Sequence, residues 1–374
     1  MRIGVPKERL RHEHRVGLTP FGVSRLVHQG HEVYVERDAG RDSHFSDEDY
    51  VGAGATIVYR PDEVYGRSEL LCRVGSLDVE EARFLNPGTA VLSFHHLAVT
   101  PREVLVELVE REITAIGYEL VECDSGDCHR PVLTSQSEIA GRLAISMAAR
   151  LLEHEEGGRG IILGSVPGVP PATVVILGAG TVGMTAARTA TALGAHVIVL
   201  DSHLPRLREA IAGNGQHLVT ALASPRNLRR YAAIADVLIG AVMIPGGRTP
   251  YLVTEEMVDT MKRGSVIIDV SIDQGGCVAT SRPTTPDNPT FQVGGVTHYC
   301  VPNMTTNVPR TASRALTIAA INQIVGTANA GIERALRVHP GLAEGVYLYR
   351  GRMVNEAAAA AVGLKATALH EMLD

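Results

Sequence analysis

The chain has 374 residues, more than one hydrophobic core usually serves, so its length predicts two domains. With 45% hydrophobic and 20% charged residues, the composition is that of a folded globular protein and excludes a disordered chain. A formal net charge of −6 argues against a nucleic-acid or anionic-membrane partner, because either needs a basic surface. The charged start MRIGVPKERL lacks the apolar core of a secretion signal, and the five cysteines form no disulfide framework, so we expect a cytoplasmic location.

Roughly the first third of the chain alternates short β-rich runs with polar helical stretches. Strands are expected at 2–6, 31–36, 69–75, 90–96 and 113–119. Helices are expected at 19–30 and 100–112, and in each a threonine N-cap precedes a proline at the first helical position. This alternation predicts a parallel sheet covered by helices.

Two long helices and a loop define the expected domain boundaries. A helix is expected at 134–156, and the Gly- and Pro-rich segment 157–171 after it is interpreted as a domain-joining loop. Residues 309–336 are expected to form one helix that returns the chain to the first domain, and the alanine-rich 355–373 a helix on its outside. We therefore predict a substrate domain of residues 1–130 and 308–374 with an NAD-binding Rossmann domain, 131–307, inserted between them.

Residues 173–203 contain the strongest motif, a strand, a glycine turn, a helix and a second strand ending in an acid. Gly178, Gly180 and Gly183 fit G-x-G-x-x-G, and Thr181 and Val182 complete the expected cofactor-binding turn. The first glycine allows the turn, the second lets the backbone approach a pyrophosphate, and the third lets helix pack on strand. An ordinary tight turn between strand and helix is the alternative.

Asp201 ends the second strand, 18 residues beyond Gly183. A carboxylate there accepts a hydrogen bond from a ribose 2′-hydroxyl and repels the 2′-phosphate of NADP, so NAD is the expected cofactor. Asp273 ends the hydrophobic run SVIIDVSIDQGG, and in a doubly wound sheet the carboxyl ends of the strands face the ligand. The pattern predicts equally well that Asp273 only caps the following turn.

Segments in chain order resemble the alanine dehydrogenase and pyridine nucleotide transhydrogenase family: MRIGVPKER, HRVGLTPFGVSRLVHQGHEV, HHLA, YELVE, SEIAGRLA, VPGVPPATVVILGAGTVG, IGAVMIPG and IIDVSIDQGGC. The resemblance covers nearly the whole chain and is strongest to soluble alanine dehydrogenase. It implies an α/β protein of two Rossmann-like, doubly wound parallel-sheet domains, with cofactor and substrate in the cleft between them, assembled as a hexamer.

The resemblance also implies roles for individual residues. Arg15 would grip the substrate carboxylate, a task that suits a planar guanidinium, and His96 would serve as general acid or base. Asp273 would lie beside His96 across the cleft, assist proton transfer and stabilise an iminium. Weaker matches place Asn303 and Met304 at the nicotinamide; for Asn303 a loop-turn role is the alternative.

Two further cofactor contacts come from the resemblance, Ser137 in SQSE and Arg206 near the adenosine. The run CDSGDCH holds Cys123, Cys128 and His129, but its spacing and the absence of a second ligand pair favour a surface loop over a metal site, and we expect no metal. His95 is interpreted as structural because it would face away from His96 on a strand.

One segment departs from the family. Where alanine dehydrogenases have KVKEP, whose second lysine holds the substrate, this chain has Arg73, Val74 and Gly75, and Gln136 replaces a methionine nearby. Arg73 would share a face with Gly75 and reach partly into the gap, so we expect it to bind the substrate. These changes predict that alanine is a poor substrate and that a bulkier or differently charged one is preferred. Drift in a weakly active alanine dehydrogenase is the alternative.

Together these features predict an NAD-dependent oxidoreductase acting on the CH–NH2 or C=N group of a small amino or 2-oxo acid. A hydride would pass to or from nicotinamide C4 with His96 and Asp273 assisting. An imine reductase or N-substituted amino-acid synthase of the same family, or a non-catalytic NAD-binding protein, is the alternative.

Overall fold

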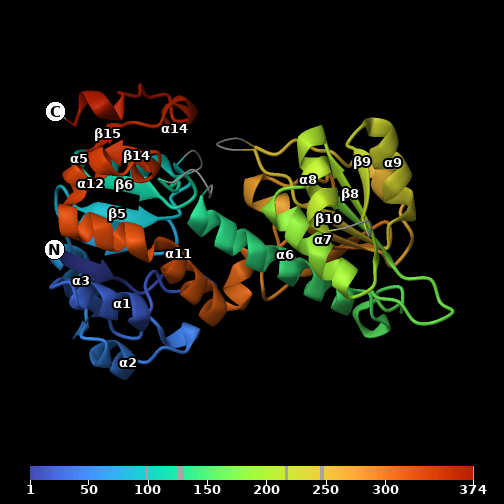
Figure 1. Ribbon diagram of the computed structural model, residues 1–374, viewed down its shortest axis with the longest axis horizontal. Helices are drawn as coiled ribbons and strands as arrows, with labels where there is room; N and C mark the ends of the chain where they lie inside the picture. The colour runs from blue at the N-terminus through green and yellow to red at the C-terminus, as the bar shows by residue number, and fades with distance from the viewer. Residues whose placement is uncertain (98–99, 125–129, 215–217, 245–247, 374) are drawn as a thin grey trace. The chain divides into compact units, whose positions relative to one another are not determined.

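A computed structural model describes residues 1–97, 100–124, 130–214, 218–244 and 248–373. The chain forms two compact units (Figure 1). The first consists of Met1–Gln136 and Thr306–Asp374, and the second of Ser137–Thr305. Across the described ranges, no helix combines the length and the apolar character needed to cross a membrane.

The first unit is built on an eight-stranded sheet in the order β15-β14-β6-β5-β4-β1-β2-β3. Strands β1 to β6 pair in parallel, whereas β14 and β15 add antiparallel pairs at one edge. The strands are β1 Arg2–Val5, β2 Glu32–Glu36, β3 Thr56–Val58, β4 Leu70–Cys72, β5 Ala90–Ser93, β6 Thr114–Gly117, β14 Val346–Tyr349 and β15 Arg352–Met353. The predicted parallel sheet is therefore present.

Helices of the first unit follow the strands. They are α1 Pro20–Val27, α2 Asp47–Gly52, α3 Pro61–Arg67, α4 Val79–Phe84 and α5 Arg102–Glu110, with η1 at Arg41–Ser43. Thr19 is the N-cap of α1, although its side chain caps no N–H. The sequence prediction was wrong for α5, whose N-cap is Pro101 and not Thr100, because the helix begins one residue later.

The C-terminal part of the first unit differs from the prediction at two glycines. The expected helix at 309–336 is divided into α11 Pro309–Ala330 and α12 Ile332–Val338, because Gly331 between them has a φ of 81°. In the alanine-rich segment the α-helix is limited to α14 Glu356–Ala361, since Gly363 follows with a φ of 73°. Positive φ is incompatible with a continuing helix and is readily adopted by glycine. The remaining elements are α13 Pro340–Ala343 and η7 Leu369–Glu371.

The second unit contains a seven-stranded sheet in the order β12-β13-β11-β10-β7-β8-β9, in which only β12 is antiparallel. The strands are β7 Thr173–Leu177, β8 His196–Asp201, β9 Leu218–Leu222, β10 Val237–Gly240, β11 Val266–Asp269, β12 Thr290–Val293 and β13 Val296–Tyr299. Its helices are α7 Thr181–Ala192, α8 Leu204–Asn214, α9 Pro225–Ile234 and α10 Glu255–Asp259, with η3 His154–Glu156 and η5 Val270–Gln274. Helix α6, Pro131–Leu151, and η6, Met304–Asn307, each continue from one unit into the other.

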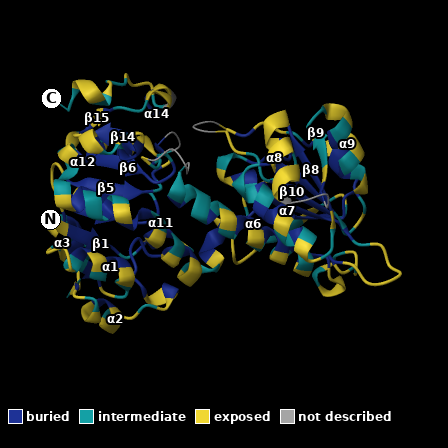
Figure 2. Cartoon of the chain, viewed as in Figure 1, coloured by how far each residue is buried: buried dark blue, intermediate teal, exposed yellow. Residues whose placement is uncertain are grey.

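The inner strands of both sheets are buried on both faces, as Figure 2 shows for each unit, whereas the edge strands β3, β9 and β12 are partly exposed. In β4, Leu70 and Cys72 join one apolar cluster and Leu71 joins the cluster on the opposite face. This alternation is the two-residue period of a strand, and it explains why the strands are continuous hydrophobic runs. Each large side chain enclosed in this way contributes about 1.5–3 kcal/mol. The polar residues that follow the strands are therefore attached to well-packed strands.

Candidate active site

The turn between β7 and α7 is shaped by its glycines. Gly178 has a φ of 102°, and a Cβ on this residue would lie 2.4 Å from the carbonyl oxygen of Ala241. A Cβ on Gly183 would lie 1.9 Å from the carbonyl oxygen of Gly178, so only glycine lets α7 approach the strand. A Cβ on Gly180 would meet no atom within 4 Å. The turn is thus closed where the protein packs on itself and open at the N-terminus of α7, where a pyrophosphate would be accepted.

Asp201 lies at the end of β8, beside this turn. One carboxylate oxygen accepts a hydrogen bond from the Ala179 N–H at 2.8 Å, and the other accepts one from the His203 N–H at 2.8 Å. The Arg206 guanidinium is 3.8 Å from Asp201 Oδ2 and is half exposed. Asp201 therefore fixes the glycine turn, while each of its oxygens keeps a second lone pair for a ribose hydroxyl.

Asp273, Asn303 and Met304 lie together after β11 and β13. Asp273 is on η5 and exposed, and its Oδ1 accepts a hydrogen bond from the Asn303 N–H at 2.8 Å. Asn303 has a φ of 54°, a left-handed value that asparagine tolerates, and Met304 is buried. The Asp273 side chain thus holds the turn at Asn303, 30 residues further along the chain, and also faces solvent.

Asp269, four residues before Asp273, is the acid that ends β11, and sequence reasoning did not single it out. It is 1% exposed, and its Oδ2 accepts from the N–H groups of Cys277 and Val278 at 3.0 and 3.3 Å. Burial raises the pKa of the Asp269 carboxyl, while these hydrogen bonds and the Ser281 hydroxyl oppose the rise. Asp269 therefore fastens the loop after Asp273. The position of Asp269 directly after three apolar strand residues was the sequence signal that could have identified it.

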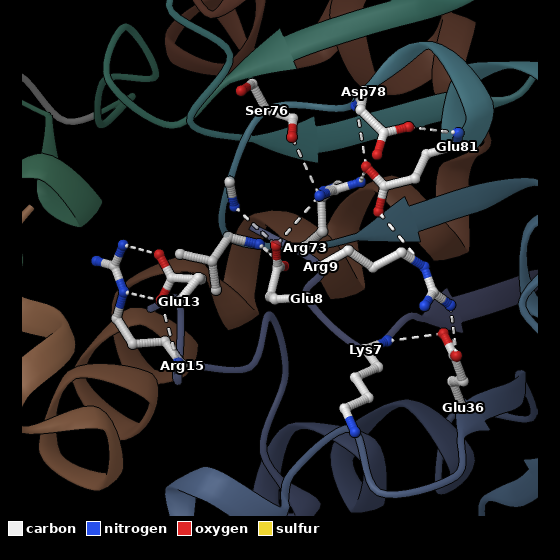
Figure 3. Close-up of polar contacts among 12 residues, drawn as sticks. Lys7, Glu8, Arg9, Glu13, Arg15, Glu36, Arg73, Ser76, Asp78 and Glu81 are labelled. Carbon is white, nitrogen blue, oxygen red and sulfur yellow. Dashed lines mark hydrogen bonds and ion pairs between the residues drawn. The ribbon is translucent and has the colours of Figure 1, made fainter. Parts of the chain in front are cut away.

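Arg15 belongs to the first unit and is 3% exposed. Its guanidinium donates from Nε and Nη2 to the two oxygens of Glu13, at 2.7 and 2.6 Å, and from Nη1 to Gln136 Oε1 at 3.1 Å. Gln136 in turn donates to the carbonyl oxygen of Ala312. A bidentate carboxylate and an amide thus fix the guanidinium in one orientation (Figure 3 shows the Glu13 contacts). Neither partner was expected from the sequence.

His96 lies beyond the carboxyl end of β5, and its side chain is 58% exposed. Its φ of 46° turns the backbone into the left-handed region, where the Glu119 carboxylate accepts from the His96 N–H at 2.7 Å. Nδ1 is 3.8 Å from the same oxygen, and the imidazole stacks on Phe94 with 6.1 Å between ring centroids. An accessible imidazole held beside a buried carboxylate is able to give and take a proton. His95, by contrast, is 1% exposed, and burial lowers the pKa of its imidazole.

Arg73 lies in different surroundings from those expected. Its side chain is fully buried, with Nη2 3.2 Å from Glu8 and Nη1 2.9 Å from Glu81 (Figure 3). It also donates to the carbonyl oxygen of Ser76 at 3.1 Å and to the hydroxyl of Tyr65 at 3.2 Å. The prediction that Arg73 reaches a substrate is therefore corrected. Two carboxylates hold the guanidinium inside the unit because an unpaired buried charge would be costly.

Gly75 has no side chain to replace the family lysine, and the space is partly taken by Leu10. A Cβ on Gly75 would lie 2.7 Å from Leu10 Cδ1 and 3.4 Å from Glu8 Oε2. The Leu10 side chain is 46% exposed, so its tip is free to move aside. Glu8 also accepts from the Val74 N–H at 2.6 Å and the Gly75 N–H at 3.3 Å. Glu8 and Arg73 together fix this loop.

The remaining predicted residues are Ser137 and those of the segment that contains Cys123, Cys128 and His129. Ser137 is half-buried on α6, at the start of the second unit. Cys128 and His129 fall outside the described residues, whereas Cys123 is disulfide-bonded, which the sequence analysis did not expect. No group of three or more His, Cys, Asp or Glu residues suited to a metal occurs in the described part of the chain.

Comparison with known proteins identifies the family. The N-terminal domain of alanine dehydrogenase/PNT matches residues 4–140 and its C-terminal domain matches residues 144–356. Alanine dehydrogenase of Methanococcus maripaludis is 42% identical over 100% of both chains, and that of Bacillus subtilis is 43% identical over 97% of this chain and 95% of its own. A solved L-alanine dehydrogenase, 42% identical, superposes with a TM-score of 0.91 over 97% of this chain and 99% of its own. The chain therefore belongs to the alanine dehydrogenase/PNT family.

Proposed function

We propose that this protein is an NAD-dependent oxidoreductase acting on the CH–NH2 or C=N group of a small amino or 2-oxo acid. The relatives named alanine dehydrogenase support this at 41–43% identity over nearly their whole length. The observation that carries it is the retention of a fixed guanidinium at Arg15 and an accessible imidazole at His96, alongside an open turn at Gly180. A protein that only bound a dinucleotide would need neither Arg15 nor His96.

In this proposal the chain's own residues bind, orient and move protons. Arg15 grips the substrate carboxylate, and Glu13 fixes the orientation of its guanidinium. His96 takes or gives the proton on the substrate nitrogen or oxygen, and Glu119 stabilises the imidazolium that forms. Asp273 assists the proton transfer and favours positive charge on an iminium nitrogen.

NAD would be held by the second unit and supplies the hydride acceptor or donor when bound. The open backbone at Gly180 and the N-terminus of α7 suit its pyrophosphate, with Thr181 and Val182 as the first residues of that helix. Asp201 would accept from the adenosine ribose, with Arg206 at its side. Asn303 and Met304 would contact the nicotinamide end, and Ser137 would also contact the cofactor.

The His96 assignment is tested by turnover of a substrate panel followed at 340 nm. Wild-type protein should oxidise an amino acid with NAD, or reduce a 2-oxo acid with an amine and NADH, and His96→Gln should be slower by on the order of a hundredfold or more. NADH binding, measured by fluorescence titration, should be unchanged in the variant. If wild-type protein binds NADH and turns over nothing in the panel, the non-catalytic alternative is correct.

Substrate choice is proposed to depend on Gly75. Without a cation at this position the site loses one contact to the substrate's oxygen atoms and gains room, filled in part by the tip of Leu10. Arg73 supplies no substitute, because it is enclosed by Glu8 and Glu81. Alanine should therefore be a poor substrate, and a bulkier amino acid or an N-substituted imine a better one.

Gly75→Lys tests this proposal directly. The side chain needs only Leu10 to move, and its ammonium would have Glu8 nearby, so the variant should fold. We expect kcat/KM for pyruvate and ammonia to rise by roughly tenfold or more, as a restored charge-assisted contact would provide. Gly75→Met, which fills the same space without charge, is the matched control and should give no such rise. Wild-type turnover of alanine at roughly 10 per second or faster would contradict the proposal.

By family resemblance we also propose a hexamer and a cytoplasmic location. Analytical ultracentrifugation checks the first, and a stable monomer at micromolar concentration would contradict it. Fractionation of cells that express the tagged protein checks the second.

A further inference from the structure

A cavity of about 990 Å³ opens at the amino ends of the parallel strands of the first unit. Its wall is formed by residues at the starts of β1, β4, β5 and β6, by the end of β14 and by α12 (β5, β6, β14 and α12 are labelled in Figure 1). Pro87–Thr89 precede β5 and line the cavity, whereas His96 follows the same strand at its other end. The cavity is therefore on the opposite edge of the sheet from His96, and the family site does not explain it.

The wall of this cavity is rich in arginine. Arg337 and Arg350 share one carboxylate, that of Glu333, with distances of 2.6 and 3.1 Å, and Arg2 is 3.7 Å from Glu69. Arg334 forms no hydrogen bond or ion pair with any residue in the described ranges. Four guanidinium groups thus face two carboxylates, although the chain as a whole has a formal net charge of −6.

The arrangement of these groups suits a ligand with several negative charges. Arg334 and Arg337 are three residues apart on α12 and so lie on the same side of the helix, while Arg350 comes from the end of β14. Guanidinium forks from two elements can bind different oxygens of one phosphate group, and each bond is charge-assisted. The volume is at the upper end of the usual range for small-molecule sites, which leaves room beyond a single phosphate.

We propose that this cavity is a second ligand site, which binds a small phosphorylated molecule carrying two or more negative charges. Arg334, Arg337 and Arg350 hold its phosphate oxygens, and Glu333 orients two of these arginines. The site is independent of the oxidoreductase function proposed above, since it uses none of the same residues.

Isothermal titration of the full-length protein with inorganic pyrophosphate, at ionic strength held constant with KCl, tests the proposal. We expect saturable binding at one site per chain. Arg334→Glu reverses a charge without disturbing the Glu333 ion pairs, and it should weaken binding at least tenfold; Arg350→Ala should weaken it less. Arg25→Ala, in an exposed residue of α1 that does not line the cavity, is the matched control and should bind as the wild type does. The melting temperature of each variant should stay at the wild-type value.

Several results would overturn the proposal. Undiminished binding to Arg334→Glu together with loss of binding in Gly180→Ala would assign the anion to the turn before α7. Binding of citrate but not of pyrophosphate would refute the phosphate class. No pyrophosphate binding, combined with a change in sedimentation of Arg334→Glu, would show that the arginines contact a second copy of the chain instead.

Discussion

The two units position their functional residues by different means. In the second unit the turn before α7 is defined by backbone, because Gly178 and Gly183 occupy places where any side chain would collide with a carbonyl oxygen. In the first unit the loops after β1 and β4 are defined by buried charge, with Arg73 between Glu8 and Glu81 and with Arg15 on Glu13. Figure 3 shows ion pairs that link Glu8, Arg73, Glu81, Arg9 and Glu36 in a row, with Arg15 paired to Glu13 beside them.

This difference has consequences for what each unit tolerates. A glycine turn fails when atoms are added, because it depends on close approach. A buried ion cluster fails when one member is removed, because the partners are left charged in a medium that solvates them poorly. The first unit also carries the departure from the family at Gly75, next to that cluster.

Removal of Arg73 should give the largest loss of stability. Arg73→Met leaves Glu8 and Glu81 buried without their shared cation, and we expect the free energy of unfolding to fall by about 3–5 kcal/mol at pH 7. Urea unfolding followed by circular dichroism measures this. Arg60→Met, at an exposed ion pair with Asp62, is the control and should cost less than about 1 kcal/mol.

The same variant should show a dependence on pH of known sign. Burial raises the pKa of the Glu8 carboxyl and Arg73 lowers it, so loss of Arg73 moves the folded-state pKa further above the unfolded value. The folded variant then binds more protons than the unfolded chain, and its stability should rise as the pH falls from 7 towards 5. A deficit that does not shrink over this range would show that lost packing, and not unpaired charge, causes the destabilisation.

The glycine turn should respond to added atoms at one position and not at another. Gly183→Ala places a methyl group against the carbonyl oxygen of Gly178 and should cost roughly 1–3 kcal/mol of folding stability. Gly180→Ala meets no atom within 4 Å, so its stability should stay within about 0.5 kcal/mol of the wild type while its affinity for NADH falls by roughly tenfold. Thermal unfolding and fluorescence titration separate the two effects. Equal stability of both variants would contradict this account of the turn.

The sequence indicated the backbone-defined features well, for physical reasons. A position with positive φ in a strand-to-helix turn strongly favours glycine, so the glycine at 178 is itself the sequence signal for the turn. The alternation of hydrophobic runs with polar helices likewise predicted the parallel pairing of β1, β2, β4, β5 and β6, although it missed the three-residue strand β3. At Gly331 and Gly363 the glycine itself indicated a helix end, but the surrounding residues, many of them alanine, favoured a longer helix, and the prediction followed them.

The charge-defined features could not be predicted in the same way. Arg73 depends on Glu8, which is 65 residues away in the sequence, and no local pattern specifies that the two meet inside the unit. The strand expected at 69–75 ends at Cys72, so the alternation that placed Arg73 on the same face as Gly75 does not extend to either residue. Glu119 is similar, because its hydrogen bond to the His96 N–H becomes visible only when β5 and β6 pair.

Asp201 acts both on the backbone of the glycine turn and through its charge, and Arg206 lies beside it. Their variants should have the smallest effects of those considered, and these effects concern the choice between NADH and NADPH. Because Asp201 already accepts the Ala179 and His203 N–H groups, Asp201→Asn disturbs the turn as well as the charge, and absolute affinity is a poor readout. The ratio of the dissociation constants of NADPH and NADH is better, since the turn affects both cofactors equally. Loss of one carboxylate near a 2′-phosphate should lower this ratio by roughly tenfold, whereas Arg206→Ala, which removes a cation, should raise it by a few-fold. If both variants change the ratio in the same direction, Asp201 selects the cofactor only through the shape of the turn.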